Sequence, residues 1–165
     1  DTTVSAASTV TVNSGIDSTY DLYMFQMQVT CDTDSQDWTM NYEVASSIDT
    51  DSDYRYDIVY GYTTSTGLSH YKDDDAAFIK INAAGSEGDD NNPLDVILYL
   101  HHPSDTNWYT TCQFIGTNIQ HDDSYQNWKG SGIYEPTAAV TGIRLGLDSG
   151  DFRDGNIRLY GLAKS

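Results

Sequence analysis

Three aspartates at alternate positions, Asp49, Asp51 and Asp53, followed by Asp57, form the best candidate for a metal site in this sequence. Alternate carboxylates in a turn can converge on one Ca²⁺ ion, which takes roughly six to eight hard oxygen ligands. The run lacks the glycine and the final glutamate of a helix–loop–helix calcium loop, so that motif is excluded. Two interpretations remain: a Ca²⁺ site formed by these four carboxylates, or a solvated acidic loop.

A stripe of tyrosines follows directly. Even spacing would place its members on one face of a strand: Tyr54, Tyr56, Tyr60 and Tyr62. The chain holds 13 tyrosines and 3 tryptophans against 4 phenylalanines, and such amphipathic rings are enriched where a surface meets a partner. The stripe is therefore either part of the core, with hydroxyls reaching the rim, or a binding surface for glycans or a neighbouring subunit.

Catalytic motifs are missing from the sequence. It contains no G-x-S-x-G elbow, no Walker loop and no dinucleotide-binding fingerprint. The 25 acidic residues make pairs of carboxylates trivially available, so such pairs do not indicate a glycosidase. The 4 histidines lack the spacing of a zinc site. We expect a protein that is not an enzyme.

The charge of the chain limits its partners. A formal net charge of −17 argues against binding to nucleic acid or to anionic membranes, since both need basic patches. Apolar stretches are too short to cross a membrane, so no membrane insertion is expected. Residues 139–165 are nearly neutral in contrast to the acidic remainder, and they contain Arg144 and Arg158. We expect these two arginines to meet an acidic partner surface, such as another copy of the chain.

The elements that must position these residues are β-strands. A chain of 165 residues is expected to form one domain, 1–165, with residues 1–7 as a polar N-terminal arm. Its first residue is Asp1, which indicates processing or trimming of a longer polypeptide. Short alternating runs separated by turn residues predict about nine strands, over 8–13, 20–30, 37–45, 54–61, 76–81, 94–101, 108–117, 140–147 and 156–163. This pattern favours an all-β fold, an antiparallel two-sheet sandwich of the jelly-roll type.

The last two predicted strands look like a closing hairpin with its tip within 148–155. Apolar residues alternate in both strands and are expected in the core: Ile143, Leu145, Leu147, Ile157 and Leu159. Arg144 and Arg158 would share the opposite face of that hairpin. Segments 63–75 and 118–136 are expected to be loops, the second of them packed. Cys31 and Cys112 are either buried free thiols or one disulfide between the two sheets.

The end of the chain also resembles a known family. The run A-V-T-G-I-R-L, and then S-G-x-F-x-x-G-x-I-x-L-Y-G-L, is similar to the C-terminal signature of small β-sandwich modules in virion proteins of tailed bacteriophages. The resemblance is specific from residue 128 to residue 162 and extends to the first half in rhythm only. It implies a location on a phage particle, and it carries no catalytic residue.

These observations together lead to an expected role. We expect a non-enzymatic virion structural protein on the particle surface, a capsid decoration or cement protein that contacts the major capsid protein. It is expected to form a small cyclic homo-oligomer such as a trimer. One alternative is a tail-fibre or host-receptor-binding module among the tail proteins. Another is a Ca²⁺-dependent, lectin-like domain that binds host surface glycans.

Overall fold

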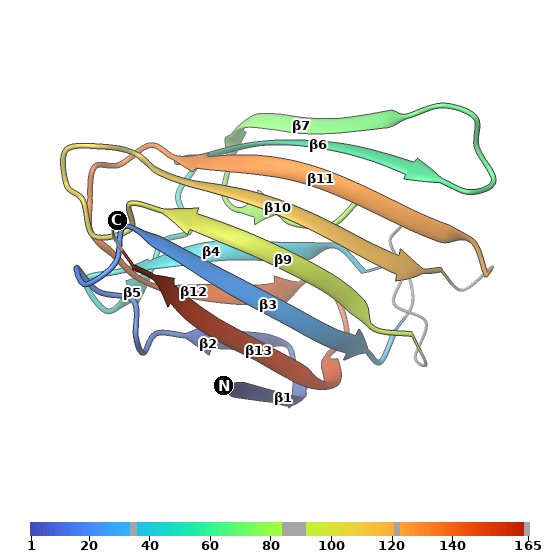
Figure 1. Ribbon diagram of the computed structural model, residues 1–165, viewed down its shortest axis with the longest axis horizontal. Helices are drawn as coiled ribbons and strands as arrows, with labels where there is room; N and C mark the ends of the chain where they lie inside the picture. Colours follow the sequence, from blue (N-terminus) through green and yellow to red (C-terminus); the bar gives the residue numbers. More distant parts are fainter. Residues whose placement is uncertain (34–35, 84–91, 121–122, 164–165) are drawn as a thin grey trace.

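The protein is built from two antiparallel sheets that pack face to face, as a computed structural model shows (Figure 1). The structure describes residues 1–33, 36–83, 92–120 and 123–163. Within these residues all regular structure is strand, and no long apolar helix that could cross a membrane occurs. The expected all-β two-sheet sandwich is confirmed, and the described part of the chain contains thirteen strands in place of nine.

The larger sheet has eight strands and lies in front in Figure 1. Its strands follow the order β1 (Thr2–Ala7), β13 (Phe152–Leu162), β3 (Leu22–Cys31), β9 (Leu94–His101), β10 (Thr110–Ile119), β11 (Tyr125–Tyr134), β6 (Tyr54–Tyr62) and β7 (Ser69–Ala76). The smaller sheet lies behind it and contains β2 (Thr9–Val12), β12 (Val140–Leu147), β4 (Trp38–Val44), β5 (Ser47–Ile48) and the short β8 (Ile79–Lys80), which pairs with β4.

The core lies between the two sheets and follows the alternation of apolar residues. In β3 the inward positions are Tyr23, Phe25, Met27 and Val29, and in β9 they are Leu94, Val96, Leu98 and Leu100. All eight side chains are buried, because every second residue of a strand points to the same face. The strand over 94–101, apolar on both faces, lies in the middle of the larger sheet as expected.

Strands replace three segments expected to be irregular. Most of the expected arm, Thr2–Ala7, forms β1, which pairs with β13. β7 is an edge strand with only its last residue buried, so it shows no apolar alternation; its charges suit an exposed edge. β11 is not apparent from the sequence, because glycines at its inward positions 130 and 132 interrupt the apolar alternation. Phe114 and Ile79 from other strands occupy the space that side chains at these positions would fill.

The closing hairpin was a wrong prediction. β12 pairs with β2 and β4 in the smaller sheet, whereas β13 pairs with β1 and β3 in the larger one. The link between them crosses the sandwich and is held by Asp32, whose carboxylate accepts the backbone N–H of Asp151 at 2.8 Å. β12 and β13 would each turn an apolar face to the core in a hairpin as well as in separate sheets. The alternation therefore does not distinguish these two topologies. Ile143, Leu145 and Ile157 are buried, while Leu147 and Leu159 are half-buried at the margin of the core.

The two cysteines are free and buried. They lie in the same sheet. Cys112 pairs with Leu100 on β9, and Leu100 pairs with Tyr23 on β3. Tyr23 lies eight residues along β3 from Cys31. That offset is roughly 26 Å, far beyond the Cα separation of about 7 Å that a disulfide allows. The inter-sheet disulfide is therefore wrong. Burial raises the pKa of the Cys31 thiol to about 11 and that of Cys112 to about 12.

Candidate functional site

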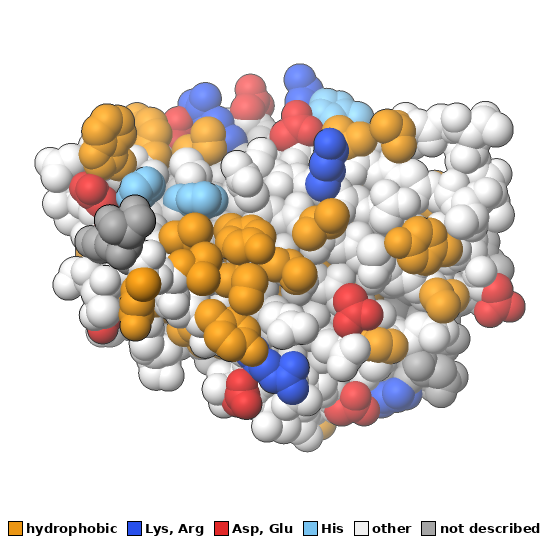
Figure 2. All heavy atoms as spheres, viewed as in Figure 1, with side chains coloured by type: hydrophobic (Ala, Val, Ile, Leu, Met, Phe, Trp, Pro, Cys, Tyr) orange, Lys and Arg blue, Asp and Glu red, His pale blue; other side chains and the backbone are white. Residues whose placement is uncertain are grey.

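The outer face of the larger sheet carries a cluster of exposed apolar side chains. Strand pairing sets Tyr160, Met24 and Tyr99 side by side on β13, β3 and β9, with Ile97 and Ile115 paired in the next row. Leu162 and Leu22 pair in the row on the other side. We call these seven residues the apolar patch. Figure 2 looks onto this face and shows hydrophobic side chains gathered over β3 and β9.

The patch is exposed to an unusual degree for such side chains. Ile115 is 55% exposed, Tyr160 42% and Ile97 37%, and Leu162 is exposed as well, whereas Leu22, Met24 and Tyr99 are half-buried. Single exposed apolar residues are ordinary, but a contiguous group on a flat sheet marks a surface for a partner.

Positively charged side chains flank one row of the patch. The chain has 8 lysines and arginines, and four of them stand at outward positions of this sheet: Arg55, Lys72, Lys129 and Arg158. Arg158 and Lys129 flank Ile97 and Ile115 in one row, with Gln26 between Arg158 and Ile97. Asp57, Asp95 and Asp154 stand on the same face, so its charge is mixed, in contrast to the net charge of −17 of the whole chain.

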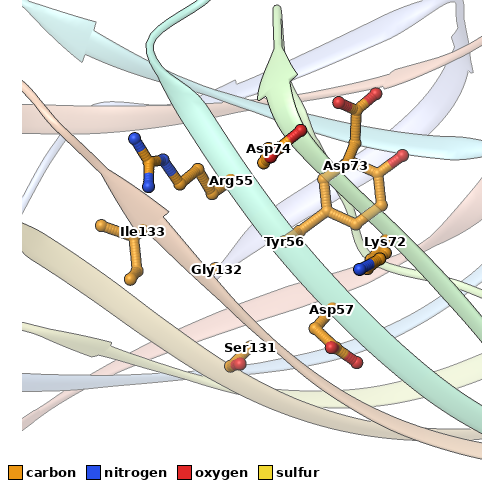
Figure 3. A pocket seen from close by; sticks show the side chains of 9 residues that line it. All are labelled: Arg55, Tyr56, Asp57, Lys72, Asp73, Asp74, Ser131, Gly132 and Ile133. Carbon is orange, nitrogen blue, oxygen red and sulfur yellow. The ribbon is translucent and has the colours of Figure 1, made fainter.

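A cleft of about 530 Å³ lies at the other side of this face, over β11, β6 and β7. Arg55 and Lys72 line the cleft from neighbouring strands, together with the carboxylates of Asp57 and Asp73 (Figure 3). Arg55 also forms an ion pair with Glu135 at 2.7 Å. Mixed charge of this kind suits a polar protein contact, in which each sign meets its opposite, better than it suits a single small ion.

The structure brings three of the four predicted metal ligands together. One carboxylate oxygen each from Asp49, Asp51 and Asp53 lies within 4.8 Å of the others. Asp49 starts the turn by accepting the backbone N–H of Asp51 at 2.9 Å, and it also accepts a hydrogen bond from the hydroxyl of Tyr134. Partial burial, and then the charges of Asp49, Asp51 and Glu135, raises the pKa of Asp53. A cation bound here would relieve that repulsion.

Asp57 does not belong to this group. It lies four residues beyond Asp53, roughly 13 Å further along the extended chain, on the outer face of β6. There its carboxylate contacts Nε2 of His70 on β7 at 3.0 Å. The four-residue spacing would keep both side chains on one side of a helix, but in this strand it carries Asp57 away from the turn.

The tyrosine stripe faces the smaller sheet. Tyr54 is fully buried and Tyr56 is 7% exposed, so neither side chain is available to a partner. The Tyr54 ring packs against Tyr134 at 5.1 Å, and its hydroxyl donates to the carbonyl of Asp49. Tyr60 and Tyr62 lie further along, half-buried, with their rings in edge contact at 5.6 Å. The core interpretation therefore holds for the first two tyrosines.

Arg144 and Arg158 cannot share one contact surface, because they stand on different sheets. Arg144 is half-buried on β12 and donates from Nη2 to Oδ1 of Asn41 at 3.2 Å. Arg158 is exposed on β13, with Nε 3.8 Å from the carboxylate of Asp1. The error follows directly from the hairpin, which would have placed both on one ribbon.

Sequence reasoning missed the apolar patch and a second exposed pair, Trp108 and Tyr109, in the β9–β10 connection. One signal for the patch was present: β9 carries Ile97 and Tyr99 opposite its core positions, so it is apolar on both faces. That pattern indicates a central strand, but it does not tell whether another layer covers the second face.

No protein-family model matches this sequence, and no curated protein matches it. Among solved structures, the chain is similar to the galectin LEC-6 of Caenorhabditis elegans, with 9% identity, a TM-score of 0.35 and 94% of each chain covered. It is also similar to a fructofuranosidase of Schwanniomyces occidentalis in complex with fructosylnystose, with 7% identity and a TM-score of 0.16, over 90% of this chain and 33% of that one. Likenesses this distant say nothing of function.

Proposed function

We propose that the protein is a non-enzymatic structural module on the surface of a tailed-phage virion, and that it self-associates through the apolar patch. The apolar patch is the observation that supports self-association. Its virion setting is supported by the resemblance of residues 128–162 to modules of phage virion proteins. A capsid decoration protein remains the first candidate within that setting, because a rigid sandwich with one adhesive face suits a protein that covers a repeating lattice.

A second copy of this chain is the proposed occupant of the patch. Two apolar patches brought together bury hydrocarbon on both sides, which is the main favourable term in association. Each copy carries a net charge of −17, so contact through the acidic loops is opposed by repulsion between like charges. Contact of the same patch on both copies closes as a two-fold dimer.

Sedimentation velocity at micromolar concentration tests the self-association. Because the two copies repel at long range, association should strengthen as the salt concentration rises from about 0.05 M to about 0.5 M. Ile115→Thr combined with Tyr160→Thr should give a monomer with an unchanged melting temperature, since both side chains are exposed and threonine suits a strand.

The matched control is Ile119→Thr. Ile119 is 42% exposed on the same strand, roughly 13 Å from Ile115 and outside the patch, so this variant should associate normally. A wild-type protein that stays monomeric at both salt concentrations, or a patch variant that associates like the wild type, contradicts the proposal. Quantitative mass spectrometry of purified phage particles tests the virion setting separately: hundreds of copies indicate the head, dozens indicate the tail, and absence refutes it.

A further inference from the structure

The connection between β9 and β10 forms a hollow of about 580 Å³. It is lined by His102, Asp105, Trp108, Tyr109 and Thr111. This volume lies within the range of roughly 300–1,000 Å³ that small-molecule sites occupy. We name it the Trp108 hollow, and we propose that it binds a neutral carbohydrate.

Two aromatic rings at this hollow are exposed to solvent. Trp108 is 67% exposed and Tyr109 is 52% exposed, although the other two tryptophans, Trp38 and Trp128, are buried in the core. Tryptophan is highly buried on average, so an exposed indole on a well-packed sandwich indicates a binding surface.

The connection is held in one shape. The backbone N–H of His102 donates to the carbonyl of Asp21 at 2.7 Å, and the carbonyl of Pro103 accepts the N–H of Val140 at 2.7 Å. His102 has a φ of +54°, uncommon for a residue with a side chain, so these contacts hold a conformation that the chain would not choose locally. The start of the connection that carries the two rings is therefore fixed, and less backbone entropy is lost there when a ligand binds.

A short turn places the polar groups beside the rings. Oδ1 of Asp105 accepts the backbone N–H of Asn107 at 2.7 Å, which fixes the carboxylate at the floor of the turn immediately before Trp108. A carboxylate offers about four acceptor sites, so Asp105 retains capacity for ligand hydroxyls. His102 and Thr111 add further hydrogen-bonding groups to the lining.

This combination favours a sugar over other small ligands. The C–H groups on one face of a pyranose ring are apolar and slightly positive, and they stack on the negative face of an indole or phenol ring. Its hydroxyls at the rim bond to carboxylate, imidazole and hydroxyl groups. A phosphate or another anion would have to approach Asp105 within a protein of net charge −17, whereas a neutral polyol meets no such repulsion.

The exposure of one tryptophan supplies the assay. Trp108 is the tryptophan that acrylamide can reach, because Trp38 and Trp128 are at most 2% exposed. Lactose, maltose and cellobiose are the first probes, followed by an array of neutral oligosaccharides. Binding should shift the Trp108 emission to shorter wavelength and reduce its quenching by acrylamide. Trp108→Ala should lower array binding at least about tenfold, a loss of about 1.4 kcal/mol or more.

The matched control is Tyr125→Ala, which removes an exposed aromatic ring, 42% exposed, from β11 outside the hollow. It should bind sugars like the wild type, and both variants should keep the melting temperature of the wild type. An array without signal, or equal binding by Trp108→Ala, overturns the proposal. So does protection of Trp108 that depends on protein concentration and not on sugar, since the rings would then cover a second copy. The Ile115→Thr, Tyr160→Thr variant separates this site from the apolar patch, because it should still bind sugar.

Discussion

Gly116→Ala should destabilise the sandwich, because Gly116 leaves room for a tryptophan ring. Gly116 on β10 lies opposite Trp128 on β11, and a Cβ atom at 116 would overlap Cζ2 and Cε2 of that indole. The ring has little freedom to move away. It is 2% exposed, and its Nε1–H donates to the carbonyl of Ile81 at 2.9 Å.

The expected loss follows from these contacts. Adding a methylene to a packed core costs about 1–3 kcal/mol, and tilting the indole would also weaken its hydrogen bond, worth about 1 kcal/mol. A total of about 2–4 kcal/mol is a large part of the roughly 5–15 kcal/mol that holds a domain together. For a chain of this size the melting temperature should fall by about 4–16 °C.

Urea unfolding followed by tryptophan fluorescence measures this loss. Gly67→Ala is the control, because a Cβ at 67 meets no described atom within 4 Å, and it should change the unfolding free energy by less than about 0.5 kcal/mol. In a Trp128→Leu background the cost of Gly116→Ala should shrink, since the clashing ring is gone. A Gly116→Ala protein as stable as the wild type would refute the packing of Trp128 over the glycine.

Three further predictions concern stability. Ile157→Ala should lower the unfolding free energy by about 2–5 kcal/mol in urea titrations, and the half-buried Leu159→Ala by less; the reverse order would contradict the core assignment. Millimolar CaCl₂ should raise the melting temperature if Asp49, Asp51 and Asp53 bind Ca²⁺, and joint replacement of the three by Asn should abolish the shift; no shift in the wild type ends that idea. The raised pKa of Asp53 means that its stabilising contribution is present below about pH 3.9, the unfolded value, and is lost as the pH rises through the folded value. With chelator present, Asp53→Asn should therefore raise the melting temperature at pH 7 but not at pH 3; an equal gain at both would show that charge is not the cause.

Sequence alone identified the elements whose side chains alternate without interruption. The strands β3, β9 and β12 and their core residues were predictable, because one face of each is continuously apolar and a strand has a strict period of two. The turn that gathers Asp49, Asp51 and Asp53 was also predictable, since alternate short carboxylates in a polar segment can converge locally.

Tertiary structure decided what alternation cannot encode. An apolar face on β12 and β13 is satisfied in a hairpin or in a crossover between sheets, so the pairing depended on distant contacts such as that of Asp32 with Asp151. β11 was hidden because the groups that fill its glycine positions, Phe114 and Ile79, come from other strands. The apolar patch arises in the same way: seven residues from four strands become one surface only when pairing sets the strands side by side.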